Sequence, residues 1–197
     1  MKKTVLRAAL VCLVFTCAGC SLHSIPANYA LQPGKESIVI GALRFPDSGI
    51  PFLQKPIHGT YGTIRINTII AKQYREYTVK PELVDATYRF AVALPQGRYR
   101  ITEINWGELS GGIDGIFTIY ETGKVYYIGS IEMEQRLVTP GQIAANYFLG
   151  ALSRSRSFPL KLKIVDEYTN AMNHFTARYP NLPREAEKSL VQFKDEP

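Results

Sequence analysis

The side chains best suited to covalent chemistry are the thiols of Cys12, Cys17 and Cys20, which all lie within the first 20 residues. A cysteine thiolate is a nucleophile that can be converted to a thioether. Cys20 directly follows Ala18 and Gly19, and no cysteine comes after it, so the rest of the chain cannot close an internal disulfide. A lone free thiol is unusual in an oxidising compartment. Modification of Cys20 to a thioether would account for its presence.

A leader of three parts opens the chain. Lys2, Lys3 and Arg7 supply positive charge, an apolar run from Ala8 to Phe15 follows, and small residues come next. This order is typical of a secretory signal peptide. The run is shorter than the ~20 apolar residues that a membrane-spanning helix needs. We therefore predict a signal peptide over residues 1–19.

The segment Cys17-Ala18-Gly19-Cys20-Ser21 resembles the lipobox of bacterial lipoproteins, although that family usually has Leu where Cys17 stands. The resemblance implies that Cys20 becomes the first residue of the mature chain and carries fatty acyl groups such as palmitate. Each buried acyl CH₂ contributes about 0.8 kcal/mol, so several chains anchor a protein firmly. Ser21 resembles the outer-membrane pattern. The alternative is cleavage after Ala18 or Cys20 and secretion of a soluble protein.

Acidic residues near a glycine-rich segment are the next candidates for chemistry. Glu103, Glu108 and Asp114 could supply the two carboxylates of a glycoside hydrolase, whose separation the sequence does not give. Residues 107–115 lack the acidic spacing of a calcium loop, and we expect a mobile loop between strands. Because ligand-binding residues concentrate on such loops, Glu108 and Asp114 are candidate ligand-binding residues.

Patterns typical of other catalytic sites are missing from the sequence. It contains no Gly-x-Ser-x-Gly elbow, no His-Glu-x-x-His pair and no Walker loop. His23, His58 and His174 are too far apart in sequence to suggest a metal site. We predict no catalytic residue, no metal site and no cofactor.

Aromatic residues are numerous, with twelve Tyr, nine Phe and one Trp. Most stand at alternating positions of predicted strands, where packing in a core explains them. Trp106 comes at the end of a predicted strand beside the 107–115 segment. We keep Trp106 as a candidate contact residue for a ligand such as a glycan.

The elements that would position these residues are short strands, because apolar and polar residues alternate between turn residues spaced about ten apart. We expect strands at Ile38–Phe45, Thr63–Ile70, Tyr74–Val79 (an edge strand), Tyr88–Leu94, Tyr99–Trp106, Ile116–Tyr120, Val125–Met133 and Lys161–Val165. The 116–133 segment is expected to form a hairpin, with Val125, Tyr127, Gly129, Ile131 and Met133 on one face. This pattern favours an antiparallel β-sandwich of about seven strands.

Two short motifs resemble segments of known families. Leu94-Pro95-Gln96-Gly97-Arg98-Tyr99-Arg100-Ile101 is similar to the Leu-Pro-x-Gly-x-Tyr turn and strand of transthyretin-like and carboxypeptidase-regulatory-like sandwich domains. The 123–129 segment and the C-terminal region resemble parts of small bacterial lipoproteins of unknown function. These resemblances imply a sandwich fold, but motifs that specify turns say little about activity.

The segments that flank the predicted sandwich have other patterns. Residues 20–36 contain proline and glycine without periodicity, and we predict a lipidated, mobile tether there. Residues 37–165 form the predicted sandwich and residues 166–197 a helical tail that packs on a sandwich edge. Within the sandwich range, residues 140–152 have helical spacing.

Two helices are expected in the tail. Asp166 can cap the first, in which Tyr168, Met172 and Phe175 recur at helical spacing, and this helix must end before Pro180. Residues 184–193 are expected to form a second short helix. The earlier helix at 140–152 precedes a Ser-Arg repeat and is expected to pack on the sandwich, or alternatively to rest on a membrane surface.

The net charge of +6 falls to +3 once the three basic residues of the leader are removed. The remaining Lys and Arg are mixed with Asp and Glu, which disfavours nucleic-acid binding. We predict a lipid-anchored, non-catalytic binding or structural module of the bacterial cell envelope, at the outer membrane, with an envelope protein or glycan as partner. The alternatives are an envelope glycan hydrolase and a secreted carrier with a ligand between its sheets.

Overall fold

The computed structural model describes residues 23–44, 62–69, 75–85, 87–106, 109–134, 156–157 and 161–193. These residues form β1 (Ser37–Arg44), β2 (Thr63–Thr68), β3 (Glu76–Val79), β4 (Glu82–Val84), β5 (Thr87–Leu94), β6 (Gly97–Trp106), β7 (Leu109–Ile119), β8 (Val125–Glu134), β9 (Arg156–Ser157), β10 (Lys161–Val165), α4 (Tyr168–Arg178), β11 (Glu187–Lys188) and β12 (Gln192–Phe193). The predicted count of about seven strands is too low. The strands absent from the prediction are two or three residues long, and each is defined by its pairing with a longer strand; they are β4, β9, β11 and β12.

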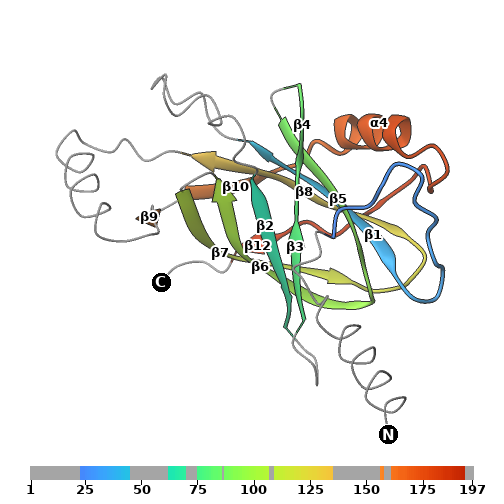
Figure 1. Cartoon of the computed structure of the whole chain (residues 1–197), viewed down its shortest axis with the longest axis horizontal. Helices are drawn as coiled ribbons and strands as arrows, with labels where there is room; N and C mark the ends of the chain where they lie inside the picture. The colour runs from blue at the N-terminus through green and yellow to red at the C-terminus, as the bar shows by residue number, and fades with distance from the viewer. Residues whose placement is uncertain are drawn as a thin grey trace, which may run out of the picture.

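The strands form two sheets that pack face to face (Figure 1). Sheet A has the order β12-β7-β6-β2-β3, with β9 also beside β7. Sheet B has the order β10-β8-β1-β5-β4, with β11 also beside β8. Two sheets around one core make a sandwich, so the predicted mainly-β fold class is confirmed.

Three pairs among the described strands run parallel, a feature that the prediction of an antiparallel sandwich did not include. β8 lies parallel to β1 in the middle of sheet B, and the short strands β11 and β9 run parallel to β8 and β7. The remaining pairs are antiparallel. The β1–β8 pair arises because the chain changes sheets between β7 and β8.

β7 and β8 are therefore not a hairpin, and the prediction of one over residues 116–133 is wrong. β8 is buried at every residue from Val125 to Ile131, which requires cover on both faces. Sheet B provides that cover, because sheet A packs on one of its faces and α4 on the other, whereas pairing with β7 would place β8 in sheet A, whose outer face is not covered by α4. At the crossing, the Ser37 hydroxyl donates to the carbonyl of Glu121 over 2.7 Å, and Gly123 adopts a φ of +83°.

A bulge in β8 also corrects the predicted face of that strand. β8 has one more residue than β1 between the pairs Ile40–Tyr127 and Ala42–Ser130, and Gly129 at the bulge has a φ of +98°. Because of this extra residue, the side chains that follow the bulge point to the opposite face from the one that simple alternation predicts. Tyr127 consequently packs on the α4 side of the sheet, while Ile131, predicted on the same face, packs between the sheets.

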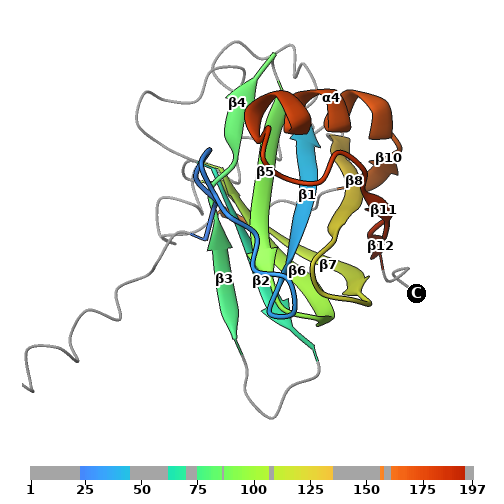
Figure 2. The ribbon, with the colours of Figure 1, turned by 90° about the vertical axis from the view of Figure 1, so that its right-hand side faces the viewer.

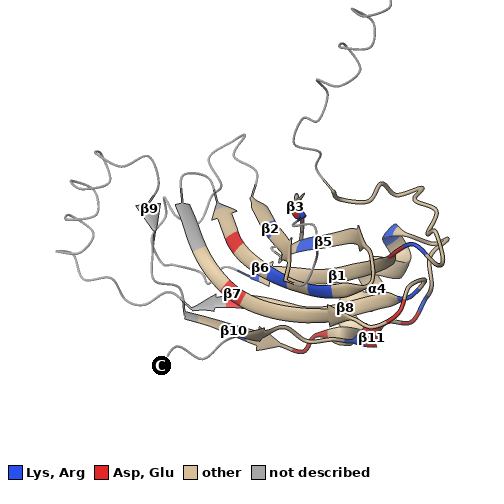
Figure 3. Cartoon of the chain, turned by 90° about the horizontal axis from the view of Figure 1, so that it is seen from below, with Lys and Arg blue, Asp and Glu red and all other residues tan. Residues whose placement is uncertain are grey.

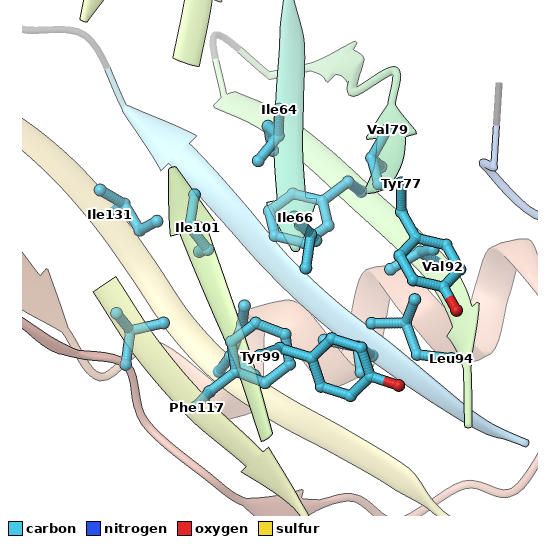
Figure 4. Packing of buried hydrophobic residues seen from close by; sticks show 14 of the residues in the cluster. Ile64, Ile66, Tyr77, Val79, Val92, Leu94, Tyr99, Ile101, Phe117 and Ile131 are labelled. Carbon is cyan, nitrogen blue, oxygen red and sulfur yellow. The ribbon is translucent and has the colours of Figure 1, made fainter. Parts of the chain in front are cut away.

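The core between the sheets consists of aliphatic and aromatic side chains from both (Figure 4). Ile64 and Ile66 of β2 and Val92 of β5 are fully buried there, as their alternation predicted. The rings of Tyr99 and Phe117 stack with centroids 5.5 Å apart. The Tyr99 hydroxyl donates to the Pro95 carbonyl over 2.7 Å, which ties down the connection between β5 and β6. Burial raises the pKa of Tyr99.

A second apolar cluster covers the outer face of sheet B. Helix α4 lies across this face (Figure 2), with Met172 and Phe175 buried against Ile38 and Ile40 of β1. The helix ends at Arg178, before Pro180 as predicted. Its N-cap residue is Glu167, but the Asp166 carboxylate does accept a hydrogen bond from the Tyr168 N–H over 3.2 Å. The described part of the molecule therefore has three layers, namely sheet A, sheet B and α4.

Residues 25–36, part of the range predicted as a mobile tether, lie on this outer face. Ile25 is 7% exposed and belongs to the second cluster, and Tyr29 and Leu31 pack against it. The Tyr29 hydroxyl hydrogen-bonds Glu36, and burial together with that bond raises the Tyr29 pKa to about 12. The tether was predicted because the spacing of residues in this segment shows no periodicity. The segment packs nevertheless, because Ile25, Tyr29 and Leu31 are apolar and reach the second cluster.

The end of the chain closes one side of the sandwich. The predicted second helix over 184–193 is wrong, because this segment forms β11 beside β8 and then β12 beside β7. Val191 lies between the two sheets at 4% exposure, and its N–H donates to the Ile128 carbonyl over 3.0 Å. The crossing segment thus satisfies backbone groups at the edges of both sheets. The helix predicted at 140–152 lies outside the described residues.

Candidate functional site

The face of sheet A that points away from the core is polar, in contrast to the covered outer face of sheet B. Its side chains alternate along β2, β3, β6 and β7 with the buried ones. We call it the polar face; its members are Thr63, Arg65, Asn67, Glu76, Thr78, Arg98, Arg100, Thr102, Glu103, Asn105, Asp114 and Thr118. Figure 3 shows both signs of charge on the neighbouring strands β6 and β7.

Arg65 links three strands of the polar face. It lies on β2, between β3 and β6. Its Nη1 is 2.8 Å from Oε2 of Glu103 on β6, and its Nε is 3.6 Å from Oε1 of Glu76 on β3. Exposed pairs of this kind contribute about 0–1 kcal/mol each. Their main effect is to hold charged groups of both signs in fixed positions on a flat surface.

A second ion pair joins β6 to β7. Nε of Arg100 lies 3.0 Å from Oδ1 of Asp114, across the two strands, and both side chains are about two-fifths exposed. Asp114 was predicted as a ligand-binding residue, and the structure places its side chain on the polar face. It is the one predicted ligand-binding residue whose side chain is described. It already has a cationic partner.

Amide and hydroxyl groups occupy the positions between these ion pairs. Nδ2 of Asn67 donates to Oγ1 of Thr102 over 3.1 Å, and Nδ2 of Asn105 lies 3.4 Å from Oγ1 of Thr63. Asn67 is only 9% exposed, and its Oδ1 has no hydrogen-bond partner among the described residues. The polar face therefore carries both donors and acceptors, although Oδ1 of Asn67 itself is buried beneath its surface.

The 107–115 segment is mostly strand, which corrects its interpretation as a mobile loop. β7 begins at Leu109, and Gly112 pairs with Glu103 of β6. Gly115 is needed for close packing, since a Cβ there would lie 2.7 Å from Cγ1 of Val191. A glycine that lets another segment approach looks the same in sequence as a loop glycine.

Of the predicted site residues Trp106, Glu108 and Cys20, the structure describes Trp106 alone. Trp106 is the last residue of β6 and pairs with Leu109 of β7. Glu108 and Cys20 lie outside the described residues. The structure thus brings Glu103 and Asp114 onto one face and places Arg65 and Arg100, which were not among the predicted site residues, beside them. The alternation of Arg65 with Ile64 and Ile66 in β2 was the available signal for an outward-facing cation.

Histidines and metal-binding groups do not form a second site in the part of the chain described. No group of three or more His, Cys, Asp or Glu that could hold a metal ion occurs among those residues. The His23 ring packs edge-on against Tyr77 with centroids 5.0 Å apart. His174 is half-buried on α4, and that burial, reinforced by the charge of Arg89, lowers its pKa. His58 is not among the described residues.

Comparison with known proteins adds little. No family model and no curated protein matches this sequence. Among solved structures, a leucine-rich repeat protein from Bacteroides thetaiotaomicron VPI-5482 is similar over 76% of this chain, at 14% sequence identity and a TM-score of 0.35. The chain spans 16% of that protein's length. This similarity is too low to support a conclusion about fold or function.

Within the described residues, no helix has the length and hydropathy that a membrane span requires.

Proposed function

We propose that this chain is a lipoprotein of the bacterial cell envelope, anchored through acylated Cys20, whose sandwich is a non-catalytic binding or structural module. The observation that carries the proposal is the leader, in which a basic start and a short apolar run precede Ala18-Gly19-Cys20. Ser21 favours the outer membrane as the destination. The resemblance of the Leu94–Ile101 segment to transthyretin-like domains belongs to the same proposal.

The arrangement of the carboxylates favours binding over glycan hydrolysis. Glycoside hydrolysis needs two carboxyl groups that are free to flank the glycosidic bond. A carboxylate that is already engaged in an ion pair with an arginine of its own sheet is poorly placed for that task. Glu103 and Asp114 each have such an arginine, Arg65 and Arg100 respectively. Both carboxylates therefore suit a role in surface structure or recognition.

The packing between the sheets favours a surface over an interior ligand site. Tyr77, Tyr99 and Phe117 are buried within the sandwich, where they contact one another (Figure 4). These aromatic rings fill space that a carrier would leave for its ligand. They are also withdrawn from the surface, where they could have stacked on a sugar ring.

We assign the polar face as the contact surface for an envelope protein. Its charges are of both signs, and Arg65, Glu76, Glu103, Arg100 and Asp114 are already paired within the sheet, so a protein with the complementary pattern could exchange ion pairs and hydrogen bonds with it. The opposite face of the sandwich is covered by α4 and is not available in the same way.

Reversal of charge on the polar face tests this assignment. In-cell crosslinking followed by affinity purification should recover an envelope protein with the native chain, and recovery should fall at least tenfold with the double variant Arg65→Glu and Arg100→Glu. Arg184→Glu, at an exposed position of the tail, is the matched control and should leave recovery unchanged. Equal recovery with both variants would remove the polar face from the interaction.

Labelling with radioactive palmitate tests the anchor. The native protein should incorporate label and partition into a detergent phase, whereas Cys20→Ser should do neither. Cys17→Ser, a change three residues away within the leader, is the control and should still be labelled. Label that survives in Cys20→Ser would contradict the proposed anchor.

A further inference from the structure

The described chain begins on a sheet edge, not in a free segment. The His23 N–H donates to the Thr78 carbonyl of β3 over 3.0 Å. The Ser24 hydroxyl donates to the Lys80 carbonyl over 2.8 Å and accepts from the Lys80 N–H over 3.0 Å. In Figure 2 the blue start of the chain lies beside the end of β3. Residues 23–24 are thus fixed to the edge of sheet A.

The next residue fixes the same segment to sheet B. The Ile25 N–H donates to the Ala91 carbonyl of β5 over 3.2 Å, and the Ile25 carbonyl accepts from the Tyr179 hydroxyl over 3.4 Å. The Ile25 side chain is 7% exposed. Releasing this segment would break bonds to both sheets and expose an isoleucine, so the anchor cannot readily gain length by peeling it away.

The distance from the anchor to this edge is set by covalent geometry. His23 comes three positions after Cys20, and a fully extended chain spans at most about 3.6 Å per residue, or about 11 Å over these three steps. The polar headgroup layer on one side of a bilayer is roughly 5–8 Å thick. Only a few ångströms remain between the headgroups and the edge of the sandwich.

We propose that the edge formed by β3 and β4 rests on the phospholipid headgroups of the membrane in which Cys20 is anchored. This inference depends on the proposed lipid anchor. The edge carries Leu83 of β4, an apolar side chain that is 52% exposed. Leu83 lies three residues beyond Lys80, at the side of the sandwich where the anchor enters.

The same geometry determines which side of the sandwich faces away from the membrane. β3 and β4 are at one end of the strand orders of sheets A and B, and β12 and β10 are at the other. With strands about 4.8 Å apart, the two edges are separated by about 19 Å. The polar face then stands upright on the membrane, accessible to a partner that lies beside the lipoprotein.

Photocrosslinking in the full-length protein tests the orientation. A photoreactive phenylalanine analogue replaces Leu83 in one variant and Gln192, exposed on β12, in the control. Irradiation of cells, followed by mass spectrometry of the crosslinked peptides, should give phospholipid adducts at position 83 at least tenfold above those at position 192. Acylation of Cys20 is determined on the same samples.

The two proposals fail in different ways. Absence of acylation would overturn both the anchor and the orientation. Acylated protein with equal lipid adducts at the two positions, or with more at 192, would overturn the orientation alone and leave the anchor intact. A Gly/Ser linker of about 12 residues inserted between Leu22 and His23 should abolish the excess of adducts at position 83 in acylated protein. Persistence of that excess would also contradict the limit set by the short connection.

Discussion

At the scale of single residues, glycines and half-buried polar groups have roles that their type alone does not reveal. Gly129 has a φ of +98°, and a Cβ on it would lie 2.6 Å from Cγ2 of Ile164. Gly34 has a φ of +88°, but a Cβ there would meet open space, since no atom lies within 4 Å of that position. A side chain at Gly34 would therefore meet backbone strain alone, whereas a side chain at Gly129 would meet both backbone strain and steric crowding.

Replacement of these two glycines by alanine should therefore differ in cost. Gly34→Ala should lower the free energy of unfolding by about 1 kcal/mol, the cost of a left-handed alanine. Gly129→Ala should lower it by about 2–5 kcal/mol, because overpacking against Ile164 adds to the same backbone cost. Urea denaturation monitored by circular dichroism measures both. Equal losses would mean that β8 and β10 can separate without penalty.

His174 predicts a pH dependence of stability. Burial, the largest cause, and the nearby cations Arg89 and Arg178 lower its pKa from the ordinary value of 6.5, against the opposing charges of Glu82 and Asp85. The unfolded chain then binds the proton more tightly than the folded one, so stability is complete above about pH 6.5 and falls as the pH drops below it.

The His174→Gln variant removes this contribution. Between about pH 7.5 and about pH 5, the native protein should lose more stability in urea denaturation than the variant does. The Asp166 carboxyl, whose pKa Lys188 lowers below 3.8, loses its stabilising charge only at more acidic pH and so does not confuse the comparison. A loss of equal size in both proteins would show that His174 is equally easy to protonate in the folded and unfolded states.

At the scale of elements, alternation predicted the long strands and helical spacing predicted α4, while pairing between distant segments could not be predicted. β2 follows the apolar alternation that the sequence shows, and in β5 the residues Phe90, Val92 and Leu94 all face the core between the sheets. β1 was also predicted, although it is buried on both faces from Ser37 to Leu43. β11 and β12 have two residues each, so only their partners β8 and β7 make them strands. Local sequence also does not say that β7 and β8 belong to different sheets.

The crossing segment between β11 and β12 gives the element-scale prediction. Val191→Ala should lower the free energy of unfolding by about 2 kcal/mol, because it removes two methyl groups from a side chain buried between the sheets and leaves a cavity. Gln192→Ala changes the exposed neighbouring residue and should stay within about 0.5 kcal/mol of the native protein. Thermal and urea unfolding compare the two. Similar losses would place the segment outside the cooperative core.

At the scale of the whole molecule, both ends of the described chain tie the edges of the two sheets together. His23–Ile25 join β3 to β5, and the 187–193 segment joins β8 to β7. Asp114 was predicted as a candidate from its place near glycines, but its pairing with Arg100 depends on the register of β6 and β7, which sequence spacing does not contain. The polar face is accordingly a property of the assembled sheet.

The central claim is that this sandwich is mounted on a membrane through Cys20. The most direct measurement is the intact mass of the mature protein purified in detergent from a Gram-negative bacterium, together with the mass of its N-terminal peptide. The account predicts a chain that begins at Cys20 and carries diacylglyceryl and further acyl mass. An unmodified chain that begins at Ser21 or at another residue would contradict the anchor, and with it the placement of the β3–β4 edge on the membrane.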